Sequence, residues 1–69
     1  MADIDSAFKI LRIRQVQERT GLSRSTIYDR LNPSSPRFDA DFPRPVKIGA
    51  AAIGWIEEGV DKWIRSRVP

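Results

Sequence analysis

The stretch TGLSRSTIYDRL, residues 20–31, has the pattern of a tight turn followed by a short helix. Gly21 suits the left-handed conformation that closes a helix end, and the hydroxyl of Ser23 suits the N-cap of the next helix. Ile27 and Leu31 are four residues apart, so they share one face of a helix over about residues 24–32. The pattern predicts the turn and second helix of a helix-turn-helix.

The outward positions of this helix are polar or charged: Arg24, Ser25, Tyr28 and Asp29, with Arg30 to one side. Such a helix fits the major groove of DNA, where its first residues reach base edges. Arg24 lies beside the positive end of the helix dipole, so a phosphate or guanine would compensate for its position. Asp29 is the weakest candidate, because a carboxylate near phosphates is costly unless it accepts from a cytosine amine. The alternative is a solvated helix face. For Arg30, contact with the DNA backbone from the side of the helix and a salt bridge both stay open.

Composition excludes several classes of function. The 69 residues include no cysteine and no histidine, which removes thiolate sites and the commonest general base and metal ligand. A chain of this length forms one domain and buries only about 60% of its unfolded surface. We therefore expect no enzyme activity, no metal or cofactor and no small-molecule ligand.

Basic residues concentrate around the helix-turn-helix, although the net charge is only +3. Residues 9–30 contain Lys9, Arg12, Arg14, Arg19, Arg24 and Arg30 against Glu18 and Asp29. This distribution favours a double-stranded DNA partner more than the net charge does. The sequence has neither an apolar run of about 20 residues nor a signal-peptide pattern. We expect no membrane association and a cytoplasmic location, at the nucleoid when DNA is bound.

The flanking segments complete a small α+β domain over residues 9–69, after a loose tail at residues 1–8. Residues 9–13 predict a short strand and residues 14–20 a first helix with Val16 inward. Residues 32–45 contain four prolines and form a loop that Phe38 and Phe42 anchor. Residues 46–56 predict a hairpin with its turn at 49–52, and residues 57–67 a final helix. That helix has Val60, Trp63 and Ile64 on one face.

The two tryptophans, Trp55 and Trp63, lie on apolar faces of these predicted elements. A base-stacking platform is one interpretation of such residues. A domain this small needs their area, up to about 200 Å² each, to form its core. We therefore assign both residues to the core.

The resulting order of strand, helix, turn, helix, loop, hairpin and helix is that of a winged helix-turn-helix. The stretches ILRIRQVQERTGLSRSTIYDRL (10–31), FPRPVKIG (42–49) and IGWIEEGVDKWI (53–64) resemble the AlpA family of prophage regulators, within the excisionase-like and MerR-like winged-helix group. The resemblance implies a DNA-binding domain that acts as a transcriptional activator or excision factor. It implies a recognition helix at residues 24–31 and a wing at residues 47–53.

The wing departs from the family pattern, which commonly has a basic or polar residue in the turn where this chain has Ala50, Ala51 and Ala52. This departure moves the expected phosphate contacts to Arg44 and Lys47. The alternative for these two residues is a charged edge that prevents strand–strand aggregation. Arg12 and Arg14 are weaker candidates for phosphate contact near the first helix.

The preferred hypothesis is a sequence-specific transcriptional regulator of prophage or mobile-element origin. An excisionase that bends DNA beside an integrase uses the same fold and surface, so the sequence does not separate the two. Self-association on adjacent sites and contact with a recombinase stay open as further partnerships. A protein-interaction module that retains the fold is the alternative from another class, supported by the modest charge and the alanine wing tip.

Overall fold

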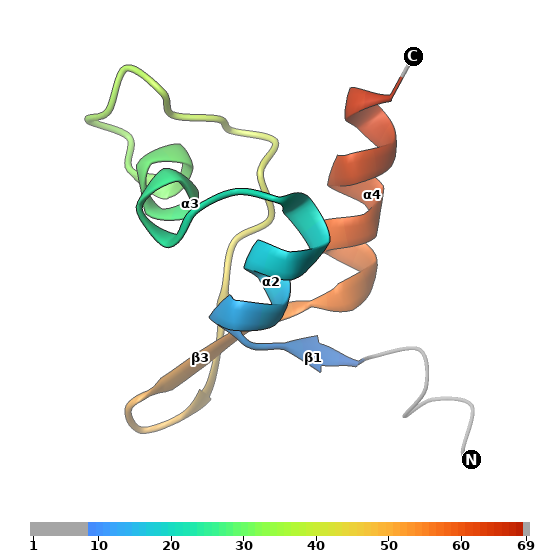
Figure 1. Cartoon of the computed structure of the whole chain (residues 1–69). Coiled ribbons are helices and arrows are strands. Elements are labelled where there is room, and N and C mark those ends of the chain that lie inside the picture. Colours follow the sequence, from blue (N-terminus) through green and yellow to red (C-terminus); the bar gives the residue numbers. More distant parts are fainter. Residues whose placement is uncertain (1–8, 69) are drawn as a thin grey trace.

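The computed structural model describes residues 9–68, so the predicted tail at residues 1–8 lies outside the described residues. The elements are β1 (Ile10–Leu11), α2 (Ile13–Thr20), α3 (Arg24–Leu31), β2 (Val46–Gly49), β3 (Ala52–Ile56) and α4 (Glu57–Arg67). Figure 1 shows α2 between α3 and α4, with the β2–β3 hairpin extending below the helices. This order confirms the predicted winged helix-turn-helix. None of the described helices is both long enough and apolar enough to span a bilayer.

The three strands form one antiparallel sheet in the order β1-β3-β2. Leu11 pairs with Trp55, and Val46 pairs with Gly54. The register shifts between Lys47 and Gly49, which marks an irregularity beside the turn. The predicted hairpin is confirmed. Its turn covers residues 50–51, which is shorter than the predicted turn at residues 49–52. β1 therefore joins the wing to the body of the domain.

The helix-turn-helix begins earlier than predicted. β1 covers only residues 10–11, and α2 begins at Ile13 because Arg12 is already its extended N-cap residue. The Arg12 N–H donates to Gln15 Oε1 at 2.9 Å. At the other end Gly21 has φ 75°, and its N–H donates to Gln17 O at 2.8 Å. The predicted left-handed glycine at the turn is confirmed.

The second helix of the motif is capped as its sequence predicts. Ser23 Oγ accepts a hydrogen bond from the Thr26 N–H at 3.2 Å, which satisfies one of the free donors of the first turn. α3 ends at Leu31, one residue before the predicted end, because Asn32 is extended. Asn32 precedes Pro33, and a proline disfavours the helical conformation of the residue before it.

One core joins every element of the domain except β2, whose four residues are exposed. Its buried members are Leu11, Val16, Ile27, Phe42, Trp55 and Val60. Trp55 is 0% exposed, and its indole Nε1 donates to Pro43 O at 3.1 Å, which confirms its assignment to the core. Trp63 is half-buried and packs edge-on against Phe42, with ring centroids 4.9 Å apart. The proline loop is thereby packed against β3 and α4.

An ion-pair cluster attaches α4 to the helix-turn-helix. The Arg19 guanidinium contacts the carboxylates of Glu57 and Asp61, the latter at 2.7 Å. The hydrogen bond to Glu57 raises the pKa of Arg19, which stays cationic. The Glu57 N–H also donates to Lys9 O at 2.8 Å, at the start of α4. These contacts hold α4 against the side of α2 that is remote from α3.

Candidate nucleic-acid interface

The outer face of α3 carries three of the predicted base-reading residues. Ile27 is 0% exposed and attaches the helix to the core. Arg24 and Ser25 are exposed, and Tyr28 is 38% exposed. The Arg24 guanidinium carbon lies 5.8 Å from the centroid of the Tyr28 ring, within the range of a cation–π contact. The fold therefore presents a cation, a hydroxyl and an aromatic ring side by side on one helix.

Asp29 has a partner that the sequence did not indicate. Its Oδ2 lies 3.6 Å from Arg37 Nη1, with side-chain exposures of 44% for Asp29 and 68% for Arg37. Arg37 belongs to the proline loop, eight residues further along the chain. No local spacing rule connects the two residues, because their contact depends on how the loop folds back beside α3.

Arg30 turns toward the body of the protein. Its guanidinium carbon lies 5.8 Å from the centroid of the Trp63 ring. Its Nε is buried and has no hydrogen-bond partner within residues 9–68. The Arg30 carbonyl accepts from the Asp39 N–H at 2.9 Å, which ties the loop to α3. These contacts favour a structural role for Arg30.

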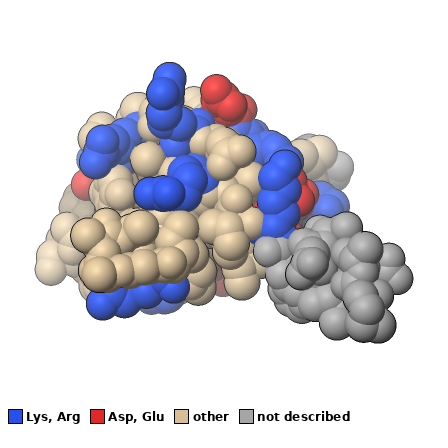
Figure 2. All heavy atoms as spheres, turned by 90° about the horizontal axis from the view of Figure 1, so that it is seen from below, with Lys and Arg blue, Asp and Glu red and all other residues tan. Residues whose placement is uncertain are grey.

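The remaining predicted contacts lie outside α3. Arg44 and Lys47 are exposed at the entry to β2 and within it, and Arg12 and Arg14 are exposed at the start of α2. The wing also exposes Val46 and Ile48, to 37% and 43%. Figure 2 views the molecule from the hairpin end and shows several groups of basic side chains there, with acidic ones mainly near the rim. This face is suited to an anionic partner.

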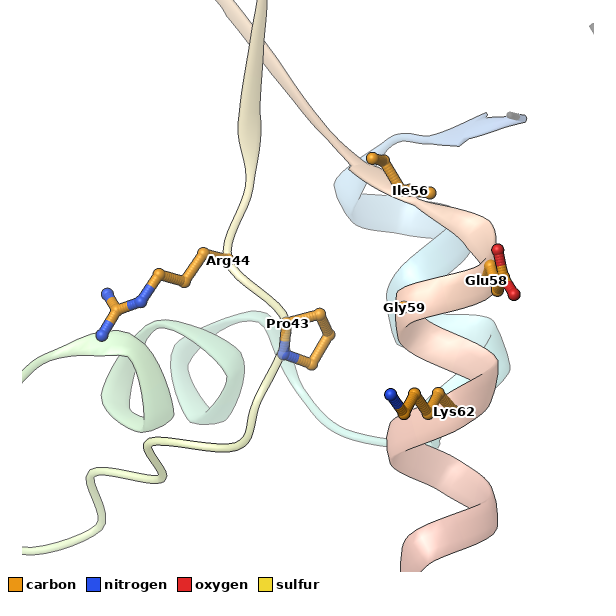
Figure 3. Close-up of a pocket in the computed structure, with 6 residues that line it drawn as sticks. All are labelled: Pro43, Arg44, Ile56, Glu58, Gly59 and Lys62. Atoms are coloured by element: carbon orange, nitrogen blue, oxygen red, sulfur yellow. The ribbon is translucent and has the colours of Figure 1, made fainter. Parts of the chain in front are cut away.

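A pocket between the proline loop and α4 has a different character. It has a volume of about 460 Å³ and is lined by Pro43, Arg44, Ile56, Glu58, Gly59 and Lys62. Figure 3 shows that the Arg44 side chain extends away from this pocket, toward α3. Glu58 is the only acidic lining residue, so the pocket has no carboxylate pair for acid–base chemistry. Among the described residues, no three potential ligands of the His, Cys, Asp and Glu types gather to hold a metal ion.

Comparison with known proteins places the chain among phage-derived regulators. Residues 9–68 match the sequence model of the family described as Prophage CP4-57 regulatory protein (AlpA). The chain is 50% identical over 62 residues to the DNA-binding transcriptional activator AlpA of Escherichia coli K12, covering 90% of this chain and 89% of that protein. It is 32% identical over 60 residues to the uncharacterized protein ORF88 of Enterobacteria phage P4, covering 87% of this chain and 61% of that protein. No solved structure matches the chain.

Proposed function

Since this chain belongs to the AlpA family of prophage regulatory proteins, we propose that it is a sequence-specific DNA-binding transcriptional regulator of prophage or mobile-element origin. The observation that carries the proposal is the outward face of α3, where Arg24, Ser25 and Tyr28 are exposed while Ile27 is buried. The E. coli relative that is 50% identical to this chain is a transcriptional activator, which favours transcriptional regulation over excision as the main role. The protein would act in the cytoplasm, where its DNA lies.

Specificity comes from the first half of α3 in the major groove. Ser25 can donate or accept at a base edge, and Tyr28 can offer its hydroxyl to a base or phosphate, or its ring to a thymine methyl. Arg24 can contact a guanine or a phosphate from the first turn of the helix. The Ser23 cap and the Arg24–Tyr28 contact hold this surface in place before DNA arrives. Little side-chain freedom is then lost on binding.

Affinity comes mainly from cations that contact phosphates. Arg44 and Lys47 are exposed on the wing side of α3, and Arg12 and Arg14 are exposed at the start of α2. Because such contacts release counterions, binding weakens steeply as salt rises. Ala50 and Ala51 at the wing tip offer no charge, so the base of the wing carries its phosphate contacts. We leave Arg30 out of this surface because it packs over Trp63.

A single module of this size covers a small footprint. We therefore expect paired or repeated sites, with neighbouring copies in contact on the DNA. The half-sites of dimeric helix-turn-helix proteins lie one helical turn, about 10 base pairs, or a multiple of it apart, which sets the spacings to test. A recombinase partner is not required for this mode of action.

The proposal is tested by measuring binding to the DNA upstream of the protein's own operon. Arg24→Ala is expected to weaken binding and to reduce the slope of log affinity against log salt by about 1 if the arginine contacts a phosphate. Tyr28→Ala is expected to weaken binding to the preferred site more than to unrelated DNA, with about 1–3 kcal/mol of discrimination lost if it reads a base.

Arg65→Ala is the matched control, because Arg65 is an exposed arginine on α4 that lines a surface with Glu57, Glu58 and Asp61 and no residue of α3. It is expected to bind like the parent apart from a small effect of net charge. Parent-like binding by both the Arg24 and the Tyr28 variants would refute the assignment of α3 as the recognition helix.

A further inference from the structure

The first part of the proline loop and the wing lie on opposite sides of α3. Figure 1 shows the hairpin below α3 and the yellow-green part of the loop curving above it, before the chain runs down past α3 to β2. The candidate phosphate contacts of the proposed function are Arg24 on α3 itself, Arg44 and Lys47 on the wing side, and Arg12 and Arg14 at the start of α2. The loop side of the recognition helix is left without one. A helix in the major groove has a sugar–phosphate backbone on each side, because the groove is about 12 Å wide and a helix fills about 10–12 Å.

Hydrogen-bonded turns determine where the loop presents Arg37 next to α3. The Asn32 carbonyl accepts from the Ser35 N–H at 2.9 Å, and the Ser35 carbonyl accepts from the Phe38 N–H at 3.0 Å. Ser35 Oγ accepts from the Arg37 N–H at 3.1 Å. The bond from the Asp39 N–H to the Arg30 carbonyl then fastens the loop to the end of α3. The backbone of Arg37 is thereby held beside the helix.

The Arg37 side chain is available to an anion. Its contact with Asp29 Oδ2 is 3.6 Å long, which exceeds an ordinary N–H···O hydrogen bond of about 2.7–3.2 Å. The guanidinium donors are therefore not consumed by the carboxylate, and the side chain is 68% exposed. Asp29 in turn lies beside a positive charge that offsets its repulsion of phosphates. The pair is therefore compatible with a DNA backbone at this end of α3.

We propose that Arg37 contacts a DNA phosphate on the loop side of the recognition helix and that its charge offsets the charge of Asp29. This inference rests on the proposed DNA-binding function and extends it to the loop. It assigns Asp29 to pairing with Arg37 in place of reading a cytosine. The recognition helix then has cations on both sides, with Arg44 and Lys47 toward the wing and Arg37 toward the loop.

The test measures binding of the full chain to a duplex of mixed sequence and to the upstream DNA, over a range of salt concentrations. Arg37→Ala is expected to lower affinity for both duplexes by roughly three- to tenfold at low salt, and to reduce the salt slope by about 1. Arg65→Ala removes the same charge from α4 and controls for net charge. Parent-like affinity and slope for Arg37→Ala would overturn the inference.

A double-mutant cycle tests the role of Asp29. Asp29→Asn in the parent is expected to change affinity by less than about twofold, equally for all sequences, because Arg37 already offsets the carboxylate. In the Arg37→Ala background the same change is expected to raise affinity and restore part of the loss, since it removes an uncompensated negative charge. If Asp29→Asn weakens binding only to DNA that contains one particular base pair, Asp29 reads that base, and its assignment as the charge partner of Arg37 is overturned.

The outcomes separate this inference from the proposed function. If Arg24→Ala and Tyr28→Ala weaken binding while Arg37→Ala does not, the recognition helix stands and the loop contact is wrong. If none of the three variants affects binding, the proposed DNA interface itself is wrong. Circular dichroism of each variant distinguishes a lost contact from a lost fold.

Discussion

The indole Nε1 of Trp63 donates a hydrogen bond to Asp39 Oδ2 at 3.0 Å, joining α4 to the proline loop across 24 residues of sequence. The same carboxylate oxygen accepts from the Arg67 guanidinium, which also lies over the Trp63 ring at 4.8 Å. Arg30 approaches that ring from α3. One aspartate and one tryptophan therefore connect the loop, the recognition helix and the final helix.

Removal of either partner is expected to destabilise the domain. Trp63→Ala removes an aromatic ring that contacts Phe42 and is expected to cost about 3–5 kcal/mol of unfolding free energy. Asp39→Ala leaves the indole N–H without its acceptor and is expected to cost about 1–3 kcal/mol. Urea titrations of both variants measure these losses. An unchanged unfolding free energy for Trp63→Ala would show that its ring adds nothing to the core.

The Asp39 carboxylate makes the stability of the domain depend on pH in the acid range. Burial would raise the pKa of Asp39, but hydrogen bonds from the Trp63 indole and the Asp41 N–H outweigh it, and the charges of Arg67 and Arg30 assist. The folded-state pKa therefore lies below the ordinary value of 3.8. The contribution of Asp39 is complete above the unfolded-state pKa and is lost as pH falls through the folded-state pKa.

Asp39→Asn removes this titration and is therefore expected to flatten the dependence of melting temperature on pH in the acid range. Asp41→Asn is a control, because Asp41 is exposed, although it sits in the same loop. Thermal melts over a series of acidic buffers provide the measurement. Parallel curves for the parent and the Asp39 variant would contradict the assignment.

Gly54 is expected to tolerate no side chain. A Cβ at this position would lie 2.4 Å from Ile10 Cγ2 and 3.1 Å from the Leu11 carbonyl oxygen. Gly54→Ala would force β1 and β3 apart and is expected to cost about 1–3 kcal/mol. Gly49→Ala is the matched control, because its Cβ would come no closer than 3.7 Å to Ala52 Cβ. Equal melting temperatures for the two variants would mean that the sheet accommodates the clash.

The Ser23 cap links stability to the proposed reading surface. Ser23→Ala removes the acceptor for the Thr26 N–H and is expected to cost about 1 kcal/mol. Because the frayed turn carries Arg24 and Ser25, affinity for DNA is expected to fall although Ser23 itself contacts no base. Ser23→Asp retains a capping oxygen and is expected to preserve the helix. Helix content by circular dichroism and DNA affinity, measured together, check the prediction.

The local elements were predictable because their signals are local. The end of α2 depends on the left-handed conformation of Gly21 alone, and the Ser23 cap is a hydrogen bond to a residue three positions away. The four-residue spacing of Ile27 and Leu31 identified the inner face of α3. Helix α4 begins and ends where predicted, with Glu57 and Glu58 in its first turn and Arg65 and Arg67 in its last. Each of these features depends on neighbours within one or two helical turns.

The sequence by itself determined the helix-turn-helix, the hairpin, the final helix and the outward position of Arg24, Ser25 and Tyr28. Only the tertiary structure decided that β1 pairs with β3, that Arg30 turns onto Trp63 and that Arg37 reaches Asp29. The physical reason is that periodicity specifies which face of an element is apolar, whereas the partner of a polar side chain depends on how distant segments pack. The folding of the proline loop against α3 and α4 therefore decided which cations surround the recognition helix.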